Sequence, residues 1–563
     1  MTVNSTEPKT ETLPIGPLQE GIWLFWRLNP ASPAYSMLEI FHFEGEFVLE
    51  AVEFAFNELI RRHEALRTTF RESEAGAVQV IACEPELRPA EVVDLRHLPD
   101  EERSERLQSA ISAAANRPFD LEAEAGIRLT ALRVSDSRTT LVLVAHHLVC
   151  DGLSMAVLLD EFGELYRSAR RGVPAELGPV PPGYSAFVGK QLAALADGTY
   201  EEEREYWRER LAGTTGSALP GAVRSSARTP VARDTALMSL TFDDALTASL
   251  TAFARRTRST QFSVLLAVMK AMIAAATGEG TTVLGMATSG RTPEFERTVG
   301  VLANTIVIRS EIDLTRSFAE MLGEVSLDLM EAIDHQDLPF SRMLADLDAE
   351  QQLGSDILRT VFTAGAVGSL KLGEGDLSEV FARTEQGPFD LHVACDITDA
   401  GIALDWEYAL GTYPHEVARG YAAAYQEILA RLLGEPDAPM DSLGLAEVLA
   451  RVPGLAGDGA GAASPAVAAD RQAAEGEEGG QDAVFTPAEE KVAAIWTEVL
   501  GVPVESPHDD FFDLGGHSLL VGATIAGVRQ QVSQSATLRM LFDYPQLREF
   551  VSQLEVDGQP ARS

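Results

Sequence analysis

Cysteine is scarce in this chain. The 563 residues include three cysteines, Cys83, Cys150 and Cys395, which lie far apart and lack the spacing of a metal site. A disulfide framework is therefore not expected, and the reducing cytoplasm is the compartment that this composition favours. The first 14 residues are polar and lack the apolar core that a signal peptide needs.

Positive charge and long hydrophobic runs are also scarce. The chain has 45 Lys and Arg against 85 Asp and Glu, a formal net charge of −40. This balance argues against a nucleic-acid partner, because binding to phosphates relies on Lys and Arg, and it equally disfavours anionic membranes. The most apolar stretch, residues 262–276, is too short to span a bilayer and contains Lys270. It is better interpreted as a buried helix.

Large apolar residues are almost missing from residues 453–484, which are rich in Ala, Gly and Glu. Such a segment cannot bury enough surface to offset its ordering entropy, so it predicts a flexible linker. The chain is also too long for one hydrophobic core. We therefore divide it into a flexible N-terminus (1–12), two lobes of a large unit (13–175 and 176–450), a linker (451–484), a small unit (485–556) and a tail (557–563).

The two units differ in their expected secondary structure. The large unit mixes predicted strands at 37–44, 127–134, 141–145, 283–287, 305–312 and 401–408 with predicted helices, among them 154–170, 201–211 and 261–276. The small unit opens with Thr486-Pro487-Ala488-Glu489, a capping box with proline at the first helical position. The pattern favours an α/β large unit followed by a short all-α bundle.

The strongest candidate for chemistry directly follows the apolar run 141–144. The sequence there reads Ala145-His146-His147-Leu148-Val149-Cys150-Asp151-Gly152. Successive side chains of a strand point to opposite faces, so one histidine is expected to face a cleft and the other to be packed inside. A histidine with a near-neutral pKa can take or give a proton, which can be worth about 10²–10⁴-fold in rate.

Spacing alone leaves two other interpretations of these residues open. Both histidines could be core groups with satisfied hydrogen bonds, and Asp151 could only cap the following helix. Alternatively, His146 or His147 could bind a metal ion together with Asp151. Zinc usually takes three or four ligands, and no further cluster of ligands is found near this segment, so no metal is expected.

Several segments together resemble the condensation domains of nonribosomal peptide synthetases. His-His-x-x-x-Asp-Gly at the end of an apolar strand is similar to the signature of that family, whose relatives are the chloramphenicol acetyltransferase-like acyltransferases. Further similar segments follow in family order at 17–21, 62–70, 117–121, 299–305, 335–340 and 389–391. The resemblance covers about residues 13–448 and implies a two-lobed, α/β chloramphenicol acetyltransferase-like fold.

The same resemblance implies roles for individual residues. His147 would face a tunnel between the two lobes, where it would position or deprotonate the attacking amine or stabilise the tetrahedral intermediate. His146 would be structural, and Gly152 would permit close approach of the backbone. Asp151 would form a supporting ion pair with Arg67, which by itself looks like an ordinary surface charge.

A second motif lies in the small unit, where residues 510–520 read DFFDLGGHSLL. Two glycines and a serine at a helix start present a hydroxyl beside free backbone N–H groups, a place that favours a phosphate ester. Ser518 could also be a simple helix cap. The string resembles the attachment site of peptidyl carrier proteins, which implies that Ser518 carries 4′-phosphopantetheine.

The favoured function is transfer of a carrier-bound acyl or peptidyl thioester onto the amine, or possibly the hydroxyl, of an acceptor. The implied partners are an upstream donor carrier, a phosphopantetheinyl transferase and an adenylation enzyme that acts in trans, since no adenylate-forming domain stands between the two units. The alternatives are a catalytically silent platform that recruits a tailoring enzyme, an epimerisation domain and a metal hydrolase. Epimerisation domains normally follow their carrier, and degenerate platforms tend to lose the double histidine.

Overall fold

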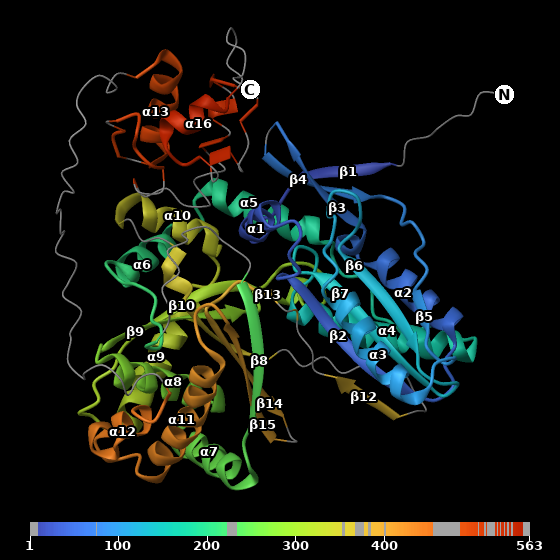
Figure 1. Ribbon diagram of the computed structural model, residues 1–563, viewed down its shortest axis with the longest axis horizontal. Coiled ribbons are helices and arrows are strands. Elements are labelled where there is room, and N and C mark those ends of the chain that lie inside the picture. Colours follow the sequence, from blue (N-terminus) through green and yellow to red (C-terminus); the bar gives the residue numbers. More distant parts are fainter. Residues whose placement is uncertain are drawn as a thin grey trace.

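The computed structural model describes residues 9–453 and 485–554, with gaps. The gaps are residues 75, 222–232, 352–354, 366–375, 381–383, 385, 399–400, 501, 505, 512–513, 515–523, 526, 530, 534, 537–539 and 542–543. Figure 1 shows two large lobes and a small helical unit. Residues 1–8, residues 454–484 of the predicted linker and the predicted tail 557–563 lie outside the described residues. The predicted flexible N-terminus (1–12) is too long, because residues 10–12 already belong to a strand that pairs with residues 80–82.

The first lobe contains a mixed five-stranded sheet in the order β12-β2-β7-β6-β5 and a three-stranded sheet in the order β1-β4-β3. Its apolar core gathers the inner residues of the larger sheet and of helices α1, α2 and α4. Helix α5 adds Tyr184 and Phe187 to this core. The elements are β1 (Thr10–Pro14), α1 (Glu20–Leu28), β2 (Ser36–Glu44), α2 (Leu49–Arg62), η1 (Glu64–Arg67), β3 (Thr68–Ser73), β4 (Gly76–Ala82), β5 (Glu91–Asp94), α3 (Asp100–Ala115), β6 (Ile127–Arg133), β7 (Arg138–His146), α4 (Gly152–Arg171) and α5 (Tyr184–Asp197).

The second lobe is built on a seven-stranded sheet in the order β10-β9-β11-β14-β15-β8-β13. Helices α8, α9 and α11 contribute many of the side chains of its separate core. The elements are α6 (Glu201–Leu211), β8 (Arg233–Thr241), α7 (Asp244–Thr257), α8 (Gln261–Thr277), β9 (Thr281–Thr288), β10 (Asn304–Glu311), α9 (Phe318–Asp334), α10 (Phe340–Gln351), β11 (Thr360–Ala364), β12 (Asp376–Val380), β13 (Gln386–Gly387), β14 (Leu391–Thr398), β15 (Gly401–Ala409), α11 (His415–Gly434) and α12 (Leu445–Leu449).

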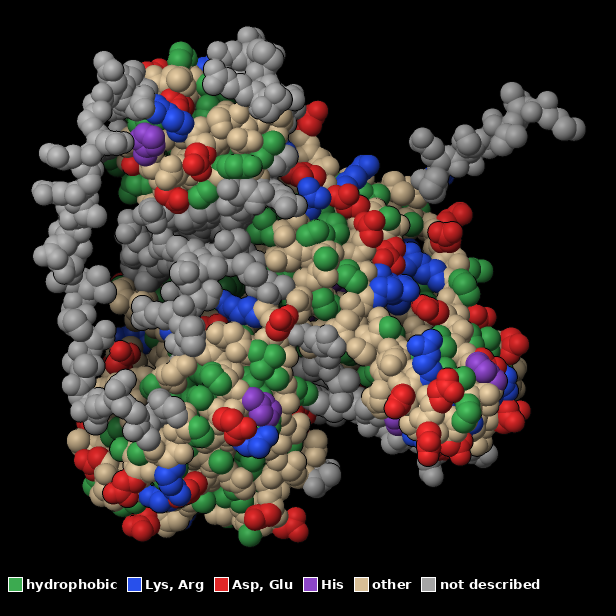
Figure 2. All heavy atoms as spheres, in the orientation of Figure 1, with side chains coloured by type: hydrophobic (Ala, Val, Ile, Leu, Met, Phe, Trp, Pro, Cys, Tyr) green, Lys and Arg blue, Asp and Glu red, His purple; other side chains and the backbone are tan. Residues whose placement is uncertain are grey.

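Two segments of the second lobe cross into the first. Strand β12 pairs antiparallel with β2 and extends the sheet of the first lobe. The loop between β9 and β10, residues 289–303, places Phe295, Val299 and Leu302 in the core of the first lobe. Figure 2 shows a notch between the lobes on the side away from the small unit. The lobes are therefore joined by two chain segments of the second lobe that enter the first, as well as by side-chain contacts.

The small unit is helical, as the sequence predicted. Helix α13 (Pro487–Leu500) begins with the expected capping box: Glu489 accepts a hydrogen bond from the Thr486 N–H, and the Glu489 N–H donates to Thr486 Oγ1 at 3.2 Å. Trp496 packs against Phe511 and against Phe550 of α16 (Leu547–Ser552). This core holds the unit together on its own.

Helix α8 is buried, as expected for residues 262–276. Within the described residues, no single helix is long and apolar enough to cross a membrane; α7 and α8 pass such a test only as a pair bent by 101°. Lys270 of α8 is fully buried and donates a hydrogen bond to the carbonyl oxygen of Ile308 at 2.7 Å. Burial lowers the pKa of Lys270 from 10.5 to about 7.

We expect Lys270→Met to stabilise the protein at pH 7. Between about pH 7 and 10.5 the unfolded chain holds a proton on Lys270 that the folded protein lacks, so the free energy of unfolding rises with pH across this window. Replacing a buried ion pair by apolar residues is often stabilising by about 1–4 kcal/mol because the desolvation cost disappears, and the buried ammonium of Lys270 bears the same kind of cost. Denaturant titrations from pH 7 to 10.5 should show a flatter pH dependence for the variant, and an identical slope would contradict the expectation.

Candidate active site at the junction of the two lobes

Strand β7 ends at His146, and His147 begins the turn that follows it at the junction of the lobes. The strand lies between β2 and β6, in a register that sets His146 opposite Ser36. The strand ends in a turn in which the Val149 N–H donates to the carbonyl oxygen of His146. The His147 N–H makes one further bond, to the carbonyl oxygen of Tyr35 at 2.8 Å. The backbone is therefore fixed on both sides of the histidine pair.

His146 is packed inside the first lobe. Its side chain is buried, its Nδ1 accepts a hydrogen bond from the Leu148 N–H at 3.1 Å, and its ring meets Phe119 edge to face. Burial, with smaller contributions from His147 and Arg128, lowers the pKa of His146 to about 3. The ring is therefore neutral, as the interpretation of one packed histidine expected.

His147 differs from its neighbours. Every residue from Leu141 to Asp151 is buried except His147, which is partly exposed. Its ring stands edge-on to Tyr35, with centroids 6.1 Å apart, and no other described residue offers a hydrogen bond to its buried Nδ1. Burial lowers the pKa of His147, while the charge of Asp151 opposes this change. A neutral imidazole that reaches solvent can accept a proton or a hydrogen bond.

Asp151 is a buried polar link between the lobes. Both of its oxygens accept hydrogen bonds from Arg291 at 2.9 Å, and its Oδ2 also accepts from the backbone N–H groups of Leu302 and Ala303. Its Oδ1 caps α4 through the Ser154 N–H at 2.7 Å. These donors hold the pKa of Asp151 below its usual value although burial alone would raise it.

The predicted ion pair between Asp151 and Arg67 is wrong. The guanidinium of Arg67 instead donates to the carbonyl oxygens of Ile60, Arg61 and Ala82. Two of these carbonyls lie in the last turn of α2, where unpaired backbone oxygens attract a cation. Arg67 therefore ties the end of α2 to β4 inside the first lobe, and the partner of Asp151 comes from the second lobe.

Helix α4 binds the loop 289–303 at two places that lie two helical turns apart. Below the Asp151 cap, Ser154 Oγ donates to the carbonyl oxygen of Gly300 at 2.9 Å and accepts from Arg291. Two turns further along α4, the carboxylate of the buried Glu161 is hydrogen-bonded to Arg297 at 3.2 Å and to His63 at 2.8 Å. Sequence analysis missed Arg291, Ser154 and Glu161. Ser154 and Glu161 are seven residues apart, so they lie on one face of a helix that also buries apolar side chains. This spacing is the one sequence signal that could have indicated the contact.

Other predicted segments meet near the same junction. Asn304 Nδ2 donates to the carbonyl oxygens of Gln336 and Leu338, both at 2.7 Å, which joins segments 299–305 and 335–340. Gln19 Nε2 donates to the carbonyl oxygen of Leu148 at 2.8 Å, which attaches segment 17–21 to the residue after His147. Gly152 is the first residue of α4. Ser518 lies outside the described residues.

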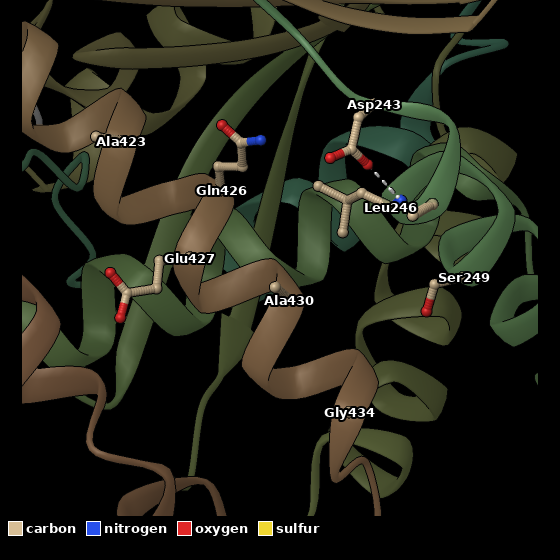
Figure 3. Close-up of a pocket in the computed structure, with 9 residues that line it drawn as sticks. Asp243, Leu246, Ser249, Ala423, Gln426, Glu427, Ala430 and Gly434 are labelled. Carbon is tan, nitrogen blue, oxygen red and sulfur yellow. Dashed lines mark hydrogen bonds between the residues drawn. The ribbon is translucent and has the colours of Figure 1, made fainter.

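Among the described residues, a metal cluster is absent and an open groove lies away from the histidine site. No group of three or more His, Cys, Asp or Glu side chains that could hold a metal occurs among the described residues. An open groove of about 560 Å³ lies between α7 and α11, lined by Asp243, Leu246, Gln426 and Glu427 among others, and Figure 3 shows that it contains none of the candidate site residues. The histidine site is therefore separate from this groove.

Comparison with known proteins agrees with this architecture. Residues 9–448 match the family model of the condensation domain, and residues 490–554 match that of the phosphopantetheine attachment site. Phosphinothricin tripeptide synthetase PhsB of Streptomyces viridochromogenes is 30% identical over 451 residues, which are 78% of this chain and 38% of that protein. Chondramide synthase of Chondromyces crocatus is 29% identical over 442 residues, which are 78% of this chain and 11% of that protein. The chain thus spans well under half the length of these curated relatives.

Solved structures show the same fold. The SgcC5 protein from Streptomyces globisporus has a TM-score of 0.63 at 24% identity, over 76% of this chain and 100% of its own. The first condensation domain of the calcium-dependent antibiotic synthetase has a TM-score of 0.65 at 20% identity, over 77% of this chain and 98% of its own. The predicted two-lobed condensation fold is confirmed. The chain belongs to the condensation domain family of nonribosomal peptide synthetases and carries a phosphopantetheine attachment domain behind it.

Proposed function

We propose that the condensation domain transfers an acyl or peptidyl group from the thioester of an upstream carrier to an acceptor amine, with His147 as the catalytic residue. The observation that carries this proposal is the partial exposure of His147 in an otherwise buried segment at the lobe junction. The order of the two domains, condensation before carrier, supports condensation over epimerisation. The intact histidine pair supports a catalytic domain over a silent platform.

In this reaction the amine nitrogen bonds to the acyl carbon, the carbon–sulfur bond breaks, and the proton leaves the nitrogen for the departing thiolate. His147 is neutral near pH 7 because its pKa is lowered, so it has a nitrogen lone pair to offer. It can hold the amine by a hydrogen bond or carry its proton. Both roles require an imidazole at a fixed position.

The surroundings of His147 supply that fixed position. The His147 N–H donates to the Tyr35 carbonyl oxygen, and Gln19 Nε2 donates to the Leu148 carbonyl oxygen. These two hydrogen bonds restrain the turn from two sides. Asp151, four residues further, is clamped by Arg291 of the second lobe. We infer that Asp151 and His146 support the site and do not touch the substrate, and that Gly152 only begins α4.

We further propose that Ser518 carries the 4′-phosphopantetheine arm of the carrier domain. The proposal is supported by the match of residues 490–554 to the family model of the phosphopantetheine attachment site, and by the described flanks, since Phe511 and Ile525 are buried in the core of the unit. The serine hydroxyl provides the oxygen of a phosphate ester. When bound, the arm supplies a thiol that holds an acyl group as a thioester. An adenylation enzyme in trans and a phosphopantetheinyl transferase are the partners this requires.

Ser518→Ala is expected to abolish attachment of the arm. Intact-mass spectrometry after incubation with a phosphopantetheinyl transferase and coenzyme A should show one added arm on the wild type and none on the variant. Ser533→Ala is a matched control, because Ser533 is a described serine of the same unit and lies outside the 510–520 motif. If the mass of the wild type is unchanged, the carrier proposal is refuted. If Ser518→Ala still gains the arm, the attachment site is a residue other than Ser518.

The condensation proposal is tested in a reconstituted reaction. The carrier domain is loaded with an aminoacyl group, an acyl-loaded donor carrier is added, and the mass of the product on this chain is followed. Growth of the aminoacyl species by the acyl mass is the expected result. Transfer of the acyl group without any increase on this chain would overturn the proposal.

A further inference from the structure

The carrier domain contacts the condensation domain through a defined ion pair. Arg529 Nη1 of the carrier lies 2.7 Å from Glu72 Oε1, at the end of strand β3 of the first lobe. Both side chains are less than one-third exposed. Figure 1 shows the carrier at the end of the molecule where α1 and α5 lie. The contact joins residues 457 positions apart in the chain.

Both partners of this ion pair are held by their own domains. The second oxygen of Glu72 pairs with Arg27 of α1 at 3.0 Å, and Arg27 also pairs with Glu122 at 2.9 Å. On the carrier, Arg529 Nε donates to the carbonyl oxygen of Ala536 at 2.7 Å. The contact therefore needs little further ordering of either side chain, which reduces the entropic cost that weakens most exposed ion pairs.

The charge of the two domains makes such a contact selective. Residues 490–554 contain four Lys and Arg against eight Asp and Glu, and the whole chain has a net charge of −40. Two acidic bodies repel each other at most orientations. Arg548, another carrier cation, is already paired with Glu489 inside the carrier. Arg529 is one of the four cationic residues of 490–554, and it meets the acidic surface of the condensation domain at Glu72.

Helix α1 connects this contact to the candidate active site. At its C-terminal end Arg27 holds Glu72, and just before its first residue Gln19 bonds the Leu148 carbonyl next to His147. Eight residues separate Gln19 from Arg27, about 12 Å along a helix axis. Trp26 of the same helix donates to the carbonyl oxygen of Phe119, whose ring meets His146. A carrier domain bound at Glu72 therefore contacts one end of α1, and the turn that holds His147 contacts the other end.

We propose that Glu72, held by Arg27 at the end of α1, is the docking point on the condensation domain for the chain's own carrier domain, which binds it through Arg529. Glu72 accepts one guanidinium on each carboxylate oxygen, so the carrier adds to the Arg27 pair without displacing it. The inference rests on the proposed function in one respect: docking here brings the acceptor arm to the side of the molecule on which α1 meets the His147 turn.

Docking is measured without substrate by cross-linking the full chain. Glu74→Cys and Gln531→Cys, both exposed and each two residues from the ion pair, are introduced with Cys83→Ser, which leaves the two buried cysteines. A short bifunctional maleimide should join the two new cysteines within one chain. Adding Arg529→Glu or Glu72→Gln to this background should lower the yield by about two- to five-fold, the range of a partly exposed ion pair.

Two further variants make the test specific. Glu122→Gln removes the other partner of Arg27 without touching the carrier, and its yield should equal that of the parent. Glu72→Lys with Arg529→Glu reverses the pair while Arg27 keeps Glu122, and it should restore the yield. An Arg529→Glu yield equal to the parent's, a swap that restores nothing, or a Glu122→Gln loss as large as that of Glu72→Gln would each overturn the proposal.

The same variants separate docking from chemistry. The rate of condensation on the loaded carrier should fall with Arg529→Glu and recover in the swap, while loading of Ser518 stays unchanged. Because cross-linking needs neither substrate nor His147, a normal cross-link in a chain that forms no product would refute the condensation proposal and leave docking intact. If product forms normally and Arg529→Glu has no effect on cross-linking, the docking proposal is refuted and the condensation proposal stands.

Discussion

His147→Ala is expected to lower the rate of condensation by about 10²–10⁴-fold, the usual contribution of a positioned acid–base side chain. The variant removes the one partly exposed side chain between Leu141 and Asp151 and leaves the buried segment around it unchanged. The ring contact with Tyr35 is lost, but the backbone bond from residue 147 to the Tyr35 carbonyl persists. The loss should therefore appear in the rate and only weakly in the stability.

The measurement is single-turnover condensation from a loaded donor carrier, followed by the mass of the product. His42→Gln is a matched control: His42 is a partly buried histidine on the adjacent strand β2, bonded to Thr140 at 2.7 Å, and its register partners Thr140 and Ser378 lie outside the His147 turn. It should keep the wild-type rate. In His147→Ala, arm attachment should be unchanged and the melting temperature should fall only slightly, because one ring contact with Tyr35 is lost. Full turnover by this variant would remove His147 from the mechanism.

Local sequence patterns predicted much of the fold. The helix expected at 201–211 is α6 with the same bounds, and those expected at 154–170 and 261–276 are α4 and α8 within two residues at each end. The strands expected at 305–312 and 401–408 are β10 and β15 within one residue. These elements are long and strongly patterned, so their own residues determine them. His146 is buried and His147 partly exposed, which agrees with the expectation of one packed histidine, although β7 ends at His146 and His147 lies in the following turn.

Contacts between the lobes could not be predicted in this way. Asp151 meets Arg291 across 140 residues, and no local pattern of either residue distinguishes Arg291 from Arg67 as its partner. The pairing is decided by the loop 289–303, whose apolar residues Phe295, Val299 and Leu302 enter the core of the other lobe. Strand β12 likewise joins a sheet whose other strands end more than 200 residues earlier. Such exchanges depend on tertiary packing, which residue spacing does not encode.

Asp151→Asn is expected to destabilise the condensation domain by about 3–5 kcal/mol, the cost of breaking a buried ion pair on one side. Asp151 and Arg291 have side chains only 1% and 6% exposed, so the variant leaves the guanidinium buried without a counter-charge. The amide also weakens the bonds that Asp151 accepts from Leu302 and Ala303. The loop should loosen from α4, and the lobe junction with it.

Urea denaturation and condensation rate measure the two consequences. Arg297→Gln is the matched control, because Arg297 lies on the same loop and pairs with α4 but is 45% exposed, so its loss should cost less than about 1 kcal/mol. Arg67→Ala removes hydrogen bonds to carbonyls within the first lobe and should leave the Asp151 pair intact. An Asp151→Asn protein as stable as the wild type, or no more affected than Arg297→Gln, would show that the second lobe is held by the apolar residues of the loop and not by this buried charge pair.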